Sequence, residues 1–207
     1  MPSTTRVAIG RYRHQVFVQT LQWKLPSEGE VEQDEFDVAS AVHVVASDAE
    51  SEIVGYARLL PTTQNYLLGT HFPHLIDGGQ PPSSPDIWEL SRYAAFDMSC
   101  AVAGRCPSMQ TRVGKRLLLG ATRYVASQGG RQIVFCTTAA IERLALRWGV
   151  DIERLGSAQF DGNDWLVAAR IHCNQRTNDA LVDVRGPTPS PRPSPIRSSN
   201  PAMSALA

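Results

Sequence analysis

The chain has 207 residues, of which 43% are hydrophobic, and its 20 basic and 20 acidic side chains cancel. This length suits one domain with a buried core, and the balanced charge excludes an overall attraction to nucleic acid or to an anionic membrane. Because the sequence starts without an apolar segment behind a basic cluster and contains no run of about 18 apolar residues, we expect a cytoplasmic protein without membrane insertion.

The first predicted element is a helix over residues 7–23, in which apolar residues such as Tyr12 and Val16 recur at steps of three to five. Pro26 would end this helix. Residues 27–37 hold six acidic side chains and few apolar ones, which is typical of a solvated segment. We therefore expect a mobile loop after the helix.

Strand-like segments follow the acidic stretch. Two apolar runs at residues 42–46 and 53–60 are separated by SDAESE, whose polar residues suit a turn. They predict an antiparallel hairpin. After a loop rich in Gly, Pro and Ser at residues 78–85, apolar and polar side chains alternate over residues 87–96 and predict a further strand.

The second half of the chain alternates helix and strand. Apolar residues at helical spacing, followed by Gly129 and Gly130, predict a helix over residues 109–128. A short strand, a helix and another strand are predicted at residues 131–137, 139–148 and 165–173. This order predicts a mixed α/β sheet. Because the sequence beyond residue 185 is rich in Pro and Ser and carries only basic charges, we expect one domain over residues 1–185 and a disordered tail over residues 186–207.

A sequence signature runs through these elements. Residues 86–96 read DIWELSRYAAF, and six positions precede them in a consistent order and spacing: Arg13, Phe17, Trp23, Asp34, Asp37 and Arg58. With HFPHL around Phe72 and TTAAIERL from Thr137, they resemble LuxI-type acyl-homoserine lactone synthases over most of the chain. The resemblance implies a single GNAT-like N-acyltransferase domain, with a mixed sheet and a central V-shaped cleft.

The resemblance also implies an activity. Such an enzyme moves an acyl chain from an acyl carrier protein to the amine of S-adenosylmethionine, then closes a lactone that serves as a quorum-sensing signal and releases methylthioadenosine. S-adenosylmethionine would be a substrate, so we expect no cofactor. The sulfonium is already activated, so we expect no metal. We also expect a monomer. His71 and His74 do not argue for a metal, because no acid or cysteine completes a ligand set with them.

The first step of this reaction needs a base, because an α-amine with a pKa of about 8 is mostly protonated at neutral pH. Glu89 is the expected base, since it lies between the apolar Trp88 and Leu90, where burial would raise its pKa, and it matches the catalytic glutamate of the family. The alternative is a structural pair with Arg92. Residues three apart on a strand face opposite sides, which makes that pair awkward. Arg92 is expected to support the site.

The remaining implied residues fall into two pockets. The S-adenosylmethionine side would be formed by Arg13, Phe17, Trp23, Asp34, Asp37 and Arg58, and the acyl pocket by Phe72, Leu118 and Thr137. An aromatic face can take a sulfonium or an adenine, and arginine can hold a carboxylate. Without the resemblance, these residues would more often belong to the core, to the surface and to a solvated acidic segment.

Basic residues crowd the predicted helix at residues 109–128 and continue on the next helix. Acyl carrier proteins are strongly acidic, so these charges suit a docking surface. An ordinary solvated helix face is the alternative. The residues expected to dock are Arg112, Lys115, Arg116 and Arg147.

Two other functions stay open. A coenzyme-A-dependent N-acyltransferase of similar fold would normally show a glycine-rich pyrophosphate loop, of which TRVGKR is a weak fragment. The second is an inactive ligand-binding homologue. Family members carry more residues before the position of Arg13, so we expect this chain to be truncated or to start late, which would leave a sheet edge or helix face unpaired. The presence of Glu89 and Arg92 argues against inactivity.

Overall fold

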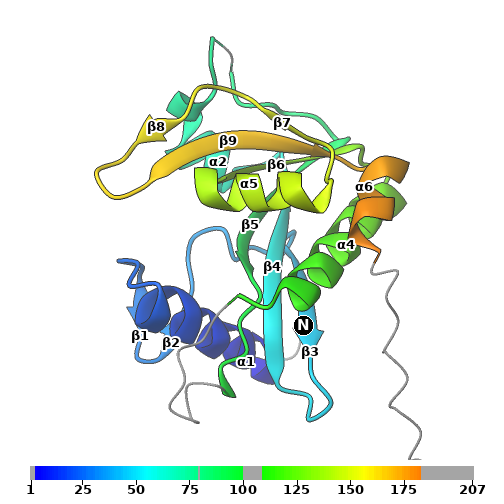
Figure 1. Ribbon diagram of the computed structural model, residues 1–207. Coiled ribbons are helices and arrows are strands. Elements are labelled where there is room, and N and C mark those ends of the chain that lie inside the picture. Colours follow the sequence, from blue (N-terminus) through cyan, green and yellow to red (C-terminus); the bar gives the residue numbers. More distant parts are fainter. Residues whose placement is uncertain (1–2, 79, 100–108, 183–207) are drawn as a thin grey trace, which may run out of the picture.

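A computed structural model of the chain describes residues 3–78, 80–99 and 109–182 (Figure 1). Its strands are β1 Ser27–Glu28, β2 Val31–Glu32, β3 Val42–Ser47, β4 Ile53–Pro61, β5 Ile87–Ala94, β6 Gln132–Thr138, β7 Ile152–Arg154, β8 Gln159–Phe160 and β9 Trp165–His172. β1 and β2 form a small ribbon of their own. The others make a seven-stranded sheet in the order β3-β4-β5-β6-β9-β7, with β8 paired to β9. Only β5 and β6 are parallel, so the sheet is mixed as expected.

The sheet splits where its parallel pair ends. Between β5 and β6 the register pairs are Ile87 with Gln132, Trp88 with Ile133 and Glu89 with Val134, and the ladder stops there. Figure 1 shows that β3 and β4 run across the direction of β9, so the two halves of the sheet diverge beyond this point. Glu89 therefore lies at the apex of the expected V-shaped opening.

One face of the sheet carries the main core. Its helices are α4 Thr111–Ser127, α5 Ala139–Trp148 and α6 Gln175–Leu181. Apolar side chains of α4 and α5 pack with Leu59 of β4 and Ile133 of β6 in one buried cluster. α5 begins where the Thr138 hydroxyl accepts a backbone hydrogen bond, and it ends at Gly149, whose φ of 88° suits a glycine cap.

The opposite face carries the other helical segments. These are α1 Ser3–Arg13, the π-helix η1 His14–Thr20, the short α2 Leu67–His71 and the 3₁₀-helix η2 Pro73–Leu75. One apolar cluster joins α1 and η1 to Tyr56 and Ala94, and a second joins α2 and η2 to Leu60 and Val134. Because Tyr56, Arg58 and Leu60 share one face of β4, Arg58 lies between the two clusters.

Most predicted elements are confirmed within two residues, including the hairpin of β3 and β4 and the helices α4 and α5. The first helix was placed wrongly, because it begins at Ser3 and ends at Thr20, and its second part has π geometry. The structure adds α2, η2, β7, β8 and α6, which are short. None of the described helices is long and apolar enough to cross a membrane. The predicted tail at residues 186–207 lies outside the described residues.

The prediction of a solvated loop over residues 27–37 was also wrong. β1 and β2 form a hairpin within it, and three of its six acids have side chains that are 7% exposed or less. Glu28, Glu30 and Glu35 are exposed, as an acidic run would suggest. The other three acids are buried because arginines from distant parts of the chain meet them.

Candidate active site

Three buried arginines gather on the face between the two apolar clusters. Arg13 ends α1, Arg58 lies in β4 and Arg92 in β5, and their exposed fractions are 2%, 0% and 9%. The segment that includes β2 brings three acids to them: Glu32, Asp34 and Asp37. Charged side chains tolerate burial only when they are paired. We call these six residues, whose formal charges cancel, the arginine–acid ring.

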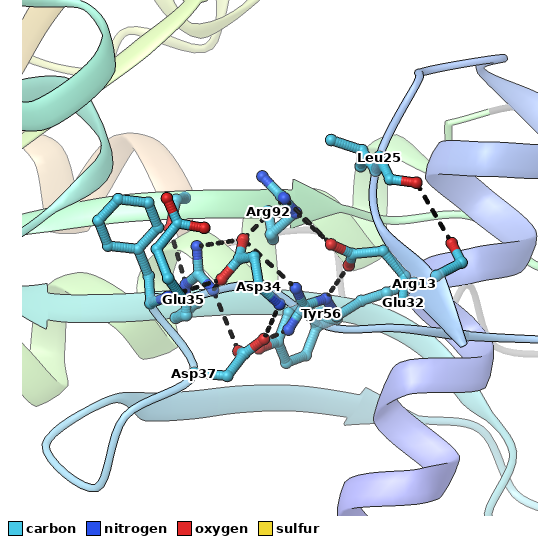
Figure 2. Close-up of polar contacts among 12 residues, drawn as sticks. Arg13, Leu25, Glu32, Asp34, Glu35, Asp37, Tyr56 and Arg92 are labelled. Carbon is cyan, nitrogen blue, oxygen red and sulfur yellow. Dashed lines mark hydrogen bonds and ion pairs between the residues drawn. The ribbon is translucent and has the colours of Figure 1, made fainter.

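Each acid of the ring contacts at least two arginines, and Figure 2 shows the network of dashed contacts around Arg13, Glu32, Asp34, Asp37 and Arg92. Glu32 accepts hydrogen bonds from Nε of Arg13 and from Nη2 of Arg92, the second at 3.0 Å. Asp34 accepts from Nη1 of Arg58 at 2.5 Å and from Nη2 of Arg92 at 2.7 Å. These contacts tie the helix α1 to both central strands.

Asp37 closes the ring. It accepts hydrogen bonds from Nη1 of Arg13 at 2.7 Å and from Nη1 of Arg58 at 3.0 Å. Burial alone would raise the pKa of Asp37, but the contacts with these arginines lower it to about 2. Burial likewise opposes the charge of Arg13, and its bonds to Glu32 and Asp37 outweigh this effect and raise its pKa. Asp37 and Arg13 therefore stay charged at neutral pH.

A bulge in β5 aims Arg92 at the ring. Ser91 pairs with Arg58 and Ala94 with Tyr56, so β5 places two residues opposite the one residue that β4 has between these pairs. Arg92 has a φ of 52°, a left-handed conformation that is unfavourable for a residue with a side chain. Regular alternation would have placed Arg92 on the face opposite to Glu89, so the bulge brings both to one side of the sheet.

Glu89 is 1% exposed and lies at the start of α2. Its carboxylate accepts hydrogen bonds from the backbone N–H groups of Leu67 at 2.9 Å and Leu68 at 2.5 Å. Burial raises the pKa of Glu89 to about 7, although these two bonds and the charge of Arg58 act in the opposite direction. Arg92 donates to Glu32 and Asp34. The alternative of a Glu89–Arg92 pair thus finds no support in this geometry.

Two aromatic side chains border the ring. Phe17 is 1% exposed, and the guanidinium of Arg92 lies 5.8 Å from the centre of its ring. Trp23 stacks on Phe17 at 5.0 Å with an interplanar angle of 24° and stays 46% exposed. Trp23 therefore offers an open indole surface next to a charged site, an arrangement suited to a cationic or planar ligand.

The residues expected to line the acyl pocket do not come together in one cluster. Phe72 packs with the cluster that includes Leu68. Leu118 is buried on the other face of the sheet, and alternation along β6 places Thr137 on that same face with Phe135. The sheet therefore separates Phe72 from the other two residues.

The basic residues expected to dock a partner divide into two kinds. Arg112, Arg116 and Arg147 have exposed side chains. Lys115 is partly buried, donates a hydrogen bond from Nζ to the carbonyl oxygen of Ala180 at 3.1 Å, and lies 5.9 Å from the ring centre of a tryptophan in α5. Lys115 thus links α4 to α6.

Sequence reasoning missed Glu32, which is as central to the ring as Asp34. No sequence signal distinguished it from Glu28 and Glu30 in the same acidic run. The only pointer was its position two residues before Asp34, because residues two apart in an extended segment face the same side.

Comparison with known proteins agrees with this site. The profile of the autoinducer synthases matches residues 3–181. An acyl-homoserine-lactone synthase of Ralstonia nicotianae is 38% identical over 183 residues, which are 87% of this chain and 88% of that protein. The solved structure of TofI in a ternary complex with an inhibitor and MTA has a TM-score of 0.75 and 37% identity, covering 87% of this chain and 91% of TofI.

A second structure is the CoA-dependent acyl-homoserine lactone synthase BjaI with SAM and isopentyl-CoA. Its TM-score is 0.73 and its identity 26%, covering 84% of this chain and 79% of BjaI. The family resemblance seen in the sequence is confirmed by these matches. The chain therefore belongs to the autoinducer synthase family and is an acyltransferase of the acyl-homoserine-lactone synthase type.

Proposed function

We propose that this protein transfers an acyl chain from an acyl carrier protein to the α-amine of S-adenosylmethionine and closes the product into a lactone. One observation carries the proposal. Glu89 is a buried carboxylate with a pKa of about 7, and it lies at the apex of the split sheet beside the arginine–acid ring. A base needs a pKa near the working pH, and this position supplies one.

In the proposed first step, Glu89 removes a proton from the substrate ammonium, directly or through a water molecule. The free amine attacks the thioester carbon, the new C–N bond forms, and the C–S bond breaks. The nitrogen loses its second proton as the amide forms, and the leaving thiolate takes up a proton in exchange and departs as the thiol of the donor. The tetrahedral oxyanion needs backbone N–H donors, and the strand edges exposed where the β5–β6 ladder stops are suited to provide them.

In the proposed second step, the methionyl carboxylate attacks the carbon attached to the sulfonium. A C–O bond closes the five-membered ring, the C–S bond breaks, and neutral methylthioadenosine leaves with both electrons of that bond. The sulfonium is already an activated leaving group, so this chemistry calls for neither a metal nor a resident cofactor.

The aromatic pair and the ring suit S-adenosylmethionine as the acceptor. The open face of Trp23, backed by Phe17, can stack on an adenine or lie against a sulfonium. The ring holds Asp34 and Arg58 at fixed positions next to this pair, where they can orient the amine and carboxylate of the substrate. TofI, which is 37% identical, was solved in a complex that holds MTA, and this supports S-adenosylmethionine as the acceptor.

The choice of acyl donor rests on the surface of α4 and α5. The exposed Arg116, Arg123, Arg143 and Arg147 present positive charge, which favours an acidic carrier protein. BjaI is described as CoA-dependent, so coenzyme A is the competing donor. We propose the carrier protein as the donor because the exposed arginines are spread over two helices, α4 and α5, which suits a protein surface better than the compact phosphates of coenzyme A.

The test is to incubate the purified protein with S-adenosylmethionine and either octanoyl-acyl carrier protein or octanoyl-coenzyme A, and to follow lactone and methylthioadenosine by mass spectrometry. Matched formation of both products with the carrier protein is expected. Faster turnover with octanoyl-coenzyme A would overturn the proposed donor. Acylation without methylthioadenosine would indicate a plain N-acyltransferase, and no product with several chain lengths would indicate an inactive homologue.

A further inference from the structure

Phe36 occupies a special place between the acids of the arginine–acid ring. It follows Asp34 by two residues and precedes Asp37 by one, yet its aromatic side chain is 3% exposed. Its backbone N–H donates to Oδ1 of Asp34 at 3.0 Å, and the guanidinium of Arg58 lies 5.6 Å from its ring centre. One side of Phe36 is therefore attached to the ring through both backbone and side chain.

The other side of Phe36 packs on the helix α2. Its ring shares an apolar cluster with Tyr66, Leu68 and Leu75, and it meets the imidazole of His71 edge to face at 5.6 Å. An exposed contact runs alongside, because Nε2 of His71 lies 2.8 Å from a carboxylate oxygen of Glu35. Both partners of that contact are about half exposed, so solvent screens it and the buried ring of Phe36 makes the stronger connection.

The position of α2 in turn sets the position of Glu89. This helix has only five residues, and its first turn has no side-chain cap from Tyr66 at its start. The Glu89 carboxylate fills that role by accepting from the N–H groups of Leu67 and Leu68. A shift of α2 therefore moves both hydrogen bonds that hold the carboxylate.

We propose that Phe36 is a positioning residue that couples the arginine–acid ring to the general base through α2. This inference rests on the proposed function only for the role of Glu89 as base. Any rearrangement of Asp34 and Asp37 on substrate binding moves Phe36, and Phe36 moves α2 and the two N–H groups bonded to Glu89. The simpler view, in which Phe36 only fills the core, predicts no such connection.

A matched pair of variants separates these views. Phe36→Ala and Leu75→Ala both remove a buried side chain from the same apolar cluster, but Leu75 belongs to η2, whereas Phe36 is bonded to Asp34 and lies against Arg58. We expect both to lose stability, whereas only Phe36→Ala lowers kcat by about tenfold or more. Phe36→Leu, which keeps most of the packing, should recover most of the activity. Equal kcat losses in Phe36→Ala and Leu75→Ala would overturn the proposal.

The pH profile supplies a second readout. The groups that act on Glu89 are Arg58, Asp34, Tyr66 and Cys136, together with the two N–H donors of α2. Loosening α2 weakens two bonds that lower the pKa of Glu89, but it also admits water and relieves burial, which is the larger influence on that pKa. The acidic limb of kcat/KM should therefore move to lower pH in Phe36→Ala and stay in place in Leu75→Ala. An unmoved limb in Phe36→Ala would contradict the coupling.

Hydrogen exchange tests the coupling without any substrate. We expect Asp37→Asn, which weakens the ring, to speed amide exchange in residues 66–72 at least threefold when Phe36 is present. In a Phe36→Ala background the same change should add nothing further. An equal added factor in both backgrounds, or no effect in either, would overturn the proposal. This experiment needs no turnover, so it tests the coupling even if the protein makes no lactone. A failure to make lactone would count against the proposed function and not against the coupling.

Discussion

Replacing Glu32 with alanine tests whether buried charge holds the arginine–acid ring together. The Glu32 side chain has no exposed surface and bonds Arg13 and Arg92 at once. Its removal gives the buried cluster a net positive charge and takes one partner from each arginine. Breaking a buried ion pair costs about 3–5 kcal/mol. Because Arg13 keeps Asp37 and Arg92 keeps Asp34, we expect about 3 kcal/mol, the lower end of that range.

The assay is urea unfolding followed by tryptophan fluorescence. The midpoint should fall while the slope with urea concentration stays the same, which identifies a change in stability. Glu30→Ala is the matched control, because Glu30 is exposed in the turn of the same small hairpin. It should change the free energy of unfolding by less than about 0.5 kcal/mol. A loss below about 1 kcal/mol for Glu32→Ala, the range of a surface ion pair, would refute the reasoning.

The base must be unprotonated and the pKa of Glu89 is about 7, so kcat/KM should fall as the pH drops below 7. Glu89→Gln should abolish this pH dependence and lower turnover by about 10²–10⁴-fold, while calorimetry still detects S-adenosylmethionine binding. The lowered pKa of Asp37 stabilises the fold above its ordinary value of 3.8, and this contribution is lost as the pH falls toward 2. Asp37→Asn should therefore flatten the acid limb of the unfolding free energy by about 2 kcal/mol. Arg116→Glu should raise KM for the acyl carrier protein severalfold without changing KM for S-adenosylmethionine, whereas Lys115→Glu should lower the thermal midpoint, because it breaks the contact between α4 and α6.

The periodic parts of the fold could be predicted from the sequence because their signals are local. The hairpin of β3 and β4 shows two apolar runs around a polar turn, and α5 begins and ends at Ala139 and Trp148 as expected. The short helix α2 has no such signal. Its five residues are too few to show a period, and its first N–H groups are satisfied by Glu89, which lies more than twenty residues away in the chain.

The candidate site could be predicted only where the family signature reached. Arg13 and Arg58 both contact Asp34, and the resemblance had assigned all three to the S-adenosylmethionine side of the site. Burial of Glu32 could not be predicted, because an acidic run gives no indication of which acids an arginine from another element will reach. The position of Arg92 depends on a left-handed residue in a strand, and such a bulge has no reliable sequence pattern when the residue is not glycine.

The three-pair seam between β5 and β6 divides the labour of the chain into two consecutive stretches. Every member of the arginine–acid ring, together with Glu89, comes before residue 93, and the exposed arginines of α4 and α5 come after residue 110. On the proposed function, reaction chemistry and carrier docking are therefore encoded in successive segments, which pair strand to strand at this seam and also pack together where α4 and α5 cover Leu59 of β4. Because the exposed arginines of α4 and α5 lie on the surface, away from the buried ring, we expect substitutions there to leave the charge geometry of the arginine–acid ring unaltered.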